Sequence, residues 1–266
     1  MKLSCICIGL GLTLCLLQCS EYLGRKPERL DPQLLEVLRT GLSSAVASQG
    51  CGSFSVAPIR GGVGTITGNS NGSRNGFNVY GCRSAQELQS LGFGNQNFSF
   101  TGDGVSGNSA QATLVSNSDY STLGSKSQSF EVTFRLDRAD AYLDAVLSGS
   151  ATNATFPVGP RIRITPDGAQ PINSEGAAQS FSSPPRNRAS VSQIRTYCFD
   201  LHDHSGGHLI GWSQPCANLT DRDRQIGNYE FDRTGIQGIL PGFRVGLVLN
   251  GATVRQLIPG EMIAPH

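Results

Sequence analysis

The chain has 266 residues, which is enough for one large all-β domain or two small ones. Charged residues make up only 15% of it, well below the roughly 25% typical of globular domains. Glycine, with 33 residues, and Ser and Asn take their place, which favours strands joined by turns over long charged helices. The net charge of +1 excludes the electrostatic attraction on which non-specific nucleic-acid binding depends, so we expect no nucleic-acid partner.

The N-terminus has the organisation of an export signal. An early cation, Lys2, precedes an uninterrupted apolar run from Ile6 to Leu17. This run is shorter than the roughly 20 residues of a membrane-spanning helix and matches the apolar region of a signal peptide. No small-x-small cleavage site follows it. We therefore predict a signal peptide over residues 1–18.

The four residues Leu16-Leu17-Gln18-Cys19 follow the apolar run. They resemble the lipobox of bacterial lipoproteins, with Gln18 where that family usually has Gly, Ala or Ser. In the family the matching cysteine, here Cys19, becomes the lipidated, palmitate-carrying first residue of the mature protein. The resemblance implies an exported protein of the bacterial cell envelope, held to a membrane by a lipid anchor. The alternative is a secreted protein with an ordinary signal peptide.

Four cysteines remain after Cys19: Cys51, Cys82, Cys198 and Cys216. An even number of cysteines in an oxidising compartment predicts two disulfides, for which three pairings exist. We favour Cys51–Cys82 and Cys198–Cys216, because each closes one continuous stretch of the chain. No C-x-x-C pair occurs, which argues against a zinc knuckle or a thioredoxin-like motif.

One helix is predicted near the start of the mature chain. Residues 19–30 are polar and form a tether, after which Asp31 and Pro32 make an N-cap followed by proline at the first helical position. Leucines at helical spacing then predict a helix over about 32–48. We expect a single β-sandwich domain over 31–266 that includes this helix.

From Ser53 onward the apolar period is two, as in strands with one buried face. The Asn250-Gly251 pair predicts a tight hairpin between the last two strands. Many short alternating strands predict an all-β fold, an antiparallel β-sandwich or jelly roll. The clearest strands are expected at 129–136, 141–149, 161–168, 242–251 and 252–260.

Three segments carry a further pattern, an F-x-V-x-F strand, a Y-x-L…L-S-G strand and a late G-x-L-x-P-G turn. Their residues are Phe130, Val132 and Phe134, then Tyr142, Leu147, Ser148 and Gly149, then Gly238, Leu240, Pro241 and Gly242. Together they resemble the β-sandwich domains of secreted and surface-attached bacterial proteins. The likeness implies the fold and transfers no active site, since many such domains have no assigned chemistry.

Common catalytic motifs are absent from the sequence. It has no G-x-S-x-G elbow, H-E-x-x-H pair, P-loop or dinucleotide fingerprint. The sequence therefore favours a non-enzymatic binding or structural module of the envelope, and leaves a protein ligand and a polysaccharide ligand both open.

Three of the four histidines fall within seven residues, at His202, His204 and His208. The segment "HDHSGGH" resembles the opening of the first cupin motif, and cupins are jelly rolls that bind a metal ion. The cupin pattern has Glu where this chain has His208, and no second motif with its further histidine follows. The alternative function is therefore a metal-dependent, cupin-like sandwich protein using His202 and His204.

Strand parity bears on this alternative. Gly206-Gly207 predicts a two-residue turn with Leu201 opposite Trp212, which would bring Ile210 and Trp212 onto the aromatic face. That register places His208 on the face opposite to His202 and His204, so no site with three histidines is predicted. Asp200, His202 and His204 then share the solvent side, as a weak site for a zinc or copper ion; otherwise we expect no cofactor.

Overall fold

The computed structural model describes residues 50–56, 74–116, 127–149, 159–173, 175–180, 190–202, 207–223, 225, 227–236 and 244–260. They all belong to one compact unit, Gln49–His266. The predicted signal peptide, the tether, Cys19 and the helix expected over 32–48 lie outside the described residues. In the part of the chain that is described, no helix is long and apolar enough to cross a membrane.

The domain is all-β and antiparallel, as predicted. Its first elements are β1 (Gly52–Val56), β2 (Arg74–Asn78), helix α3 (Ala85–Ser90), β3 (Phe93–Gln96), β4 (Phe98–Thr101), β5 (Gly104–Ser116), β6 (Ser127–Leu136) and β7 (Tyr142–Gly149). Then come β8 (Arg161–Thr165), β9 (Gly168–Ile172), β10 (Ile194–His202), β11 (His208–Trp212), the short 3-10 helix η1 (Cys216–Asn218), β12 (Phe231–Thr234) and β13 (Arg244–Gly260).

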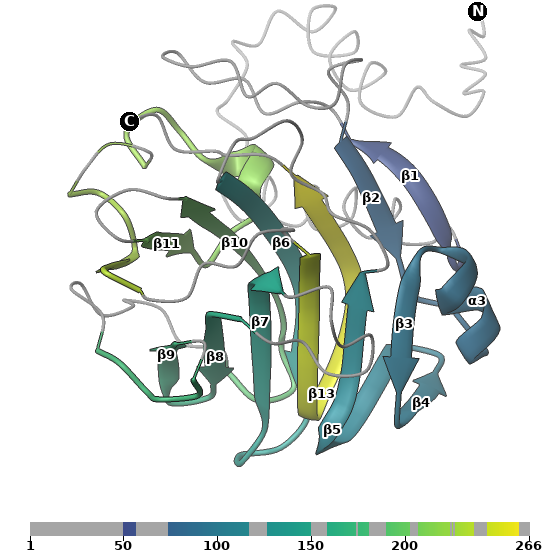
Figure 1. Ribbon diagram of the computed structural model, residues 1–266. Helices are drawn as coiled ribbons and strands as arrows, with labels where there is room; N and C mark the ends of the chain where they lie inside the picture. Colours follow the sequence, from purple (N-terminus) through teal and green to yellow (C-terminus); the bar gives the residue numbers. More distant parts are fainter. Residues whose placement is uncertain are drawn as a thin grey trace, which may run out of the picture. The chain divides into compact units, whose positions relative to one another are not determined.

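The long strand β13 joins the two layers of the sandwich (Figure 1). Its first part, up to Asn250, pairs with β7 on one side and β5 on the other. Its later part pairs with β6 and, at Gln256 and Leu257, with β2. The strand order β12-β11-β10-β6-β13-β7-β8-β9 therefore places β10–β12 in one layer and β8–β9 in the other.

The predicted hairpin at Asn250-Gly251 is wrong, because the chain continues through it as one strand. The pairing register of β13 shifts at Asn250 and again near Gln256, and Gly251 has a φ of 64°. Each β-bulge moves the apolar side chains to the other parity and bends the strand. The left-handed glycine that would form a turn here makes a bend instead, which lets one strand serve both layers.

The main core lies between the layers. In β6 the predicted inward residues are buried as expected, and in β13 the inward set changes parity at each bulge. The inward residues of these two strands are Phe130, Val132, Phe134, Leu136, Val245, Leu247, Leu249, Ala252, Val254 and Leu257. In these two strands, the alternation read from the sequence is therefore correct within each straight segment and fails across the bulges of β13.

Both favoured disulfides are present, Cys51–Cys82 and Cys198–Cys216. They indicate an oxidising environment. The sequence reading missed α3, a single-turn helix after the first disulfide. Its N-cap is Ser84, whose side chain accepts from the backbone N–H of Glu87, and Leu88 is fully buried. The S-x-x-E spacing was the available signal.

Candidate functional site

The β10–β11 hairpin has a register different from the predicted one. Leu201 lies opposite Leu209 rather than Trp212, and His202 lies opposite His208. Residues directly opposite each other in an antiparallel pair share a face. The prediction that His208 lies on the other face from His202 is therefore wrong.

The same shift moves Ile210 and Trp212 away from the aromatic face. Tyr197, Phe199 and Leu201 point into the main core as predicted. Ile210 and Trp212 instead join an outer cluster on the far side of this layer. Its members are Cys198, Ile210, Trp212, Cys216, Leu219 and Tyr229.

Residues 213–223 and 227–230 cover this outer face and explain the shift. The Cys198–Cys216 disulfide ties the segment to β10. The Trp212 indole donates to the Asp223 carbonyl at 2.9 Å, and the Cys216 N–H donates to the Glu131 carboxylate at 2.7 Å. Because both faces of β11 are covered, an apolar side chain on either face is buried. The predicted register had assumed that one face of the β10–β11 hairpin is exposed to solvent.

Polar groups are also buried on this outer face. Asp200 is fully buried and His208 is 7% exposed. His208 Nε2 lies 2.5 Å from Asp232 Oδ1 in the neighbouring strand β12. Burial raises the pKa of Tyr229, and the charges of Asp200 and then Asp232 raise it further. The two carboxylates therefore lie close to one phenol.

The three predicted metal residues have different outcomes. Asp200 lies on this outer face in β10, where it is buried rather than on the solvent side as predicted. His202 is the last residue of β10, and only its backbone position is described. His204 lies outside the described residues. Among the described residues, the one group of three potential ligands within 4.8 Å of one another is Cys51, Cys82 and Glu87, and its two cysteines form a disulfide.

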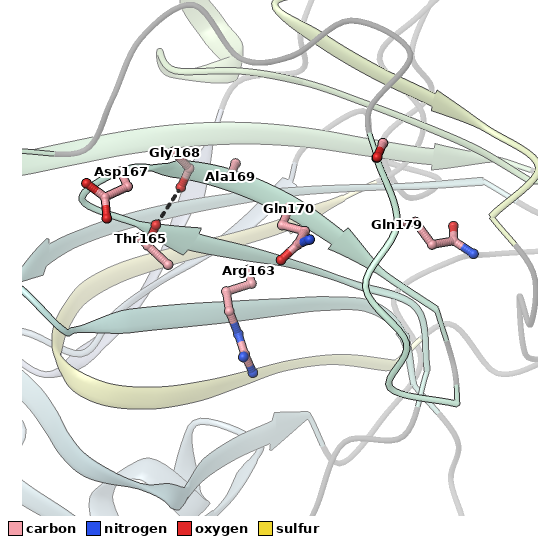
Figure 2. Close-up of a pocket in the computed structure, with 8 residues that line it drawn as sticks. Arg163, Thr165, Asp167, Gly168, Ala169, Gln170 and Gln179 are labelled. Atoms are coloured by element: carbon pink, nitrogen blue, oxygen red, sulfur yellow. Dashed lines mark hydrogen bonds between the residues drawn. The ribbon is translucent and has the colours of Figure 1, made fainter.

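A polar groove lies in the other layer, on the β8–β9 hairpin. Its volume is about 400 Å³, and its lining comes from both strands, their turn and the returning segment 175–180: Arg163, Thr165, Asp167, Gly168, Ala169, Gln170, Gln179 and Ser180. Figure 2 shows the Arg163 and Gln170 side chains from adjacent strands, with Gln179 on the returning segment. We call it the β8–β9 groove.

Local hydrogen bonds hold the walls of the β8–β9 groove. The Thr165 hydroxyl donates to the Gly168 carbonyl at 3.2 Å across the tight turn. The Gln179 N–H donates to the Pro171 carbonyl at 2.8 Å, which fixes the returning segment against β9. At the turn between β9 and the returning segment, the Ala177 N–H donates to the side-chain oxygen of Asn173 at 2.8 Å.

One buried acceptor of a residue that lines the groove has no hydrogen-bond partner in the described part of the chain. The side-chain oxygen of Gln179 is buried and makes no hydrogen bond to any described residue. A buried amide oxygen left without a donor costs about 1–3 kcal/mol.

An ion cluster beside the groove fixes Arg163. Its guanidinium donates to both oxygens of the fully buried Asp144, at 2.7 and 2.9 Å. Hydrogen bonding to Asp144 raises the pKa of Arg163, and the guanidinium also stacks on the Tyr142 ring at 4.1 Å. Arg161 approaches Asp144 at 3.5 Å. Arg163 is thereby held rigid and largely neutralised where it lines the groove.

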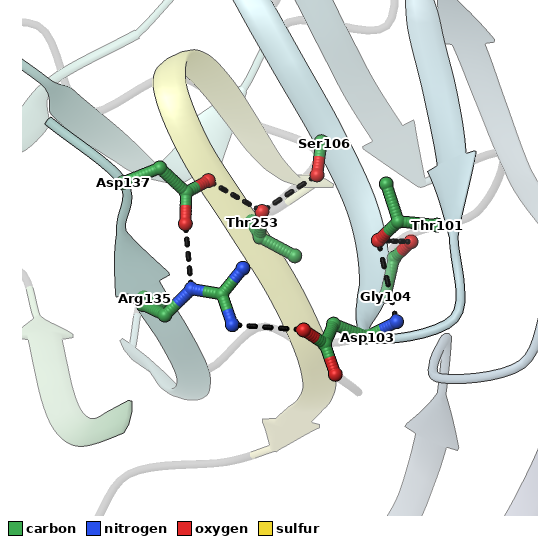
Figure 3. Close-up of polar contacts among 7 residues, drawn as sticks. All are labelled: Thr101, Asp103, Gly104, Ser106, Arg135, Asp137 and Thr253. Carbon is green, nitrogen blue, oxygen red and sulfur yellow. Dashed lines mark hydrogen bonds and ion pairs between the residues drawn. The ribbon is translucent and has the colours of Figure 1, made fainter. Parts of the chain in front are cut away.

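A second polar network crosses β4–β5, β6 and β13 (Figure 3). Arg135 donates to Asp137 at 2.6 Å and to Asp103 at 2.9 Å. The Thr253 hydroxyl donates to Asp137 at 2.6 Å. Because its one proton is used there, the Ser106 hydroxyl is the donor in the 2.6 Å hydrogen bond between Ser106 and Thr253. Hydrogen bonding to Arg135 lowers the pKa of Asp103. The donors and acceptors of this network satisfy one another, which is the pattern of a structural tie.

Comparisons with known proteins identify no family for the chain. No protein-family model matches it, and no curated protein matches it. Among solved structures, the metal-free carbohydrate recognition domain of Emp46p aligns at a TM-score of 0.42 and 13% identity, over 71% of this chain and 95% of that one. The corresponding Emp47p domain aligns at 0.40 and 12%, over 81% and 99%.

A sialidase from Trypanosoma rangeli, in complex with 2,3-difluorosialic acid, aligns at a TM-score of 0.41 and 11% identity. The alignment covers 65% of this chain but only 27% of the sialidase.

Sequence reasoning did not find the β8–β9 groove. It correctly predicted the strand with Ile162 and Ile164 inward and Arg163 outward. Gln179 lies in a segment that had only the composition of a loop, and no local pattern shows that it folds back along β9. The only available indication was an outward arginine, Arg163, on the strand that follows the strand of Asp144.

Proposed function

We propose that this protein is an exported envelope module that binds a polysaccharide in the β8–β9 groove. The observation that carries the proposal is the set of polar residues that line the open β8–β9 groove. Its lining residues offer a guanidinium, two hydroxyls, a carboxylate and two side-chain amides within one site.

The chemistry of the lining favours a neutral sugar over an ion or an apolar ligand. Sugar hydroxyls donate and accept at once, and so match closely spaced amides and hydroxyls. Asp144 balances the charge of Arg163, which disfavours selection of a strongly charged ligand. Ala169 is the only apolar side chain among the residues that line the groove.

The position of the groove suits a polymer. Strand β9 is the last strand of its layer among the described residues, and Asp167, Gln170 and Ser180 are exposed. A chain of sugars can therefore lie across the hairpin with one unit in the groove and its neighbours outside.

A lipid anchor at Cys19 is the second part of the proposal. The apolar run and the lipobox-like residues before Cys19 support it, and the two disulfides support export. Mass spectrometry of the mature N-terminus tests it: we expect a diacylglyceryl-modified Cys19, and cleavage elsewhere or an unmodified cysteine would overturn the anchor.

An array of bacterial and host glycans, probed with the purified protein, tests the binding function. The Gln179→Leu variant removes a side-chain amide from the groove lining, and we expect it to weaken the best signal by about tenfold or more. The matched control is Gln193→Leu, since Gln193 is exposed, lies away from the groove lining, and its side-chain oxygen accepts from Arg195. Absence of any glycan signal, or equal signals for the two variants, would contradict the proposal.

A further inference from the structure

Arg163 lines the β8–β9 groove with a guanidinium that is held along one edge and on one flat face. Its Nε and Nη2 donate to the two carboxylate oxygens of Asp144, at 2.7 and 2.9 Å. Asp144 is its register partner in β7 and is fully buried. The Tyr142 ring covers one face of the guanidinium, whose central carbon lies 4.1 Å from the ring centre. The orientation of the Arg163 side chain in the groove lining is therefore fixed.

These contacts leave the second edge of the guanidinium for a ligand. A guanidinium has five N–H donors in one rigid plane, and Asp144 accepts from one on Nε and one on Nη2. The other donors are the second hydrogen of Nη2 and both hydrogens of Nη1, and within the described segments none of them bonds to another residue. Because the side chain is 35% exposed and lines the groove, Nη1 and Nη2 offer two parallel donors there.

The charges around Arg163 favour neutral acceptors on this edge. Arg161 and Arg163 carry two positive charges, and Arg161 lies 3.5 Å from Asp144. Asp144 and the groove residue Asp167 carry two negative charges. A charged ligand gains little electrostatic free energy from a cluster whose formal charges cancel. Two neighbouring neutral oxygens that face the two donors are therefore the better match.

We propose that the Nη1–Nη2 edge of Arg163 binds two adjacent hydroxyl groups of one sugar ring, so that the groove selects glycans with an unsubstituted vicinal diol. This inference rests on the glycan-binding function proposed above and specifies its ligand. Each hydroxyl oxygen accepts one guanidinium N–H and keeps its own proton to donate. Gln170 is the register partner of Arg163 in β9 and is exposed. It therefore lies on the same face and offers an amide oxygen that accepts from the diol.

Periodate oxidation gives a chemical test with the unmodified protein, because periodate breaks the carbon–carbon bond of a vicinal diol. Each neutral glycan of the array is printed twice, once untreated and once after periodate oxidation and borohydride reduction. Every glycan that binds should lose about tenfold or more of its signal after oxidation. Long β-1,3-glucans are included because their internal units have no vicinal diol, and we expect no signal from them.

The Arg163→Lys variant separates the paired donors from the positive charge. Lysine keeps the charge beside Asp144 but lacks the planar fork of donors, so the signals of untreated glycans should fall about tenfold or more. The matched control is Arg195→Lys, since Arg195 is exposed on β10 and is not part of the groove lining; it should bind as the wild type does. Circular dichroism shows whether both variants fold. If Arg163→Lys does not fold, the oxidation experiment decides the question with the wild type alone.

The outcomes distinguish the diol proposal from the wider function. Signals that survive oxidation, or a β-1,3-glucan signal as strong as the others, would overturn the diol proposal and leave glycan binding in place. Equal signals for folded Arg163→Lys and Arg195→Lys would do the same. Binding confined to glycans with carboxylates would also overturn it, because the guanidinium edge would then hold an anion. Absence of any glycan signal would overturn both the diol proposal and the function on which it rests.

Discussion

Replacement of Gly211 by alanine tests the observed register of the β10–β11 hairpin. In that register Gly211 faces the main core, and an added Cβ would lie 2.1 Å from Cζ of Phe231. Carbon atoms in contact are normally about 3.5–4.0 Å apart, so the ring must move by more than about 1 Å. Phe231 is fully buried and well packed, which leaves it little room.

Overpacking of this kind costs about 1–3 kcal/mol. Alanine recovers roughly 0.5–1 kcal/mol of it, because glycine is a poor residue in the interior of a strand. We therefore expect Gly211→Ala to lower the free energy of unfolding by about 1–2 kcal/mol. Urea unfolding followed by Trp212 fluorescence measures this change.

Two further variants separate a specific clash from a general effect. Gly102→Ala is the control, since its added Cβ meets nothing within 4 Å, and it should change the free energy little. Gly211→Ala combined with Phe231→Leu should cost less than the sum of the two single changes, because the smaller side chain makes room. Additive costs, or a Gly211→Ala variant as stable as Gly102→Ala, would refute the observed register.

Three other predictions concern stability. Replacing Cys198 and Cys216 by alanine removes a disulfide with a sequence separation of 18 and should cost about 3 kcal/mol in urea unfolding. Asp144→Asn should cost about 2–4 kcal/mol, because two arginines lose a buried carboxylate, whereas Asp140→Asn, at a 77% exposed side chain, should cost less than about 1 kcal/mol. Burial raises the pKa of Tyr197 to about 12, against about 10 when unfolded. The contribution of this raised pKa to the free energy of unfolding is complete below pH 10 and is lost as the pH rises through 12. Between pH 9 and pH 11.5 the free energy of unfolding should therefore fall by about 2 kcal/mol more in the wild type than in Tyr197→Phe.

Each of these predictions has a result that would contradict it. The disulfide prediction fails if the double alanine variant and the wild type unfold at the same urea concentration. The prediction for Asp144 fails if Asp144→Asn and Asp140→Asn are equally stable in urea unfolding. Parallel pH profiles for wild type and Tyr197→Phe would show that Tyr197 is not buried as described.

The sequence predicted local features better than the long-range arrangement. Within β6, the alternation from Phe130 to Leu136 predicted which side chains are buried. At Asn250-Gly251 the same left-handed glycine serves either a turn or a bulge. Only the strands on either side of β13 decide between the two, and those partners are distant in sequence.

The hairpin register failed for a related reason. Apolar side chains do select one face of a strand when the other face is exposed to solvent. Here residues 213–223 and 227–230 cover the second face of β11, and Trp212 is buried there. That cover depends on the Cys198–Cys216 disulfide and on contacts such as Cys216 with Glu131, 85 residues away. A correctly predicted disulfide was the available indication that the segment folds back over β10.

The most direct test of the proposed function is a ¹⁵N NMR titration of the protein with the strongest oligosaccharide from the glycan array. The account predicts that shift changes concentrate at Thr165–Gln170 and at Gln179 and Ser180, and that Gln179→Leu removes them. Changes confined to another surface, such as the network of Arg135, Asp103 and Asp137, would contradict binding in the β8–β9 groove.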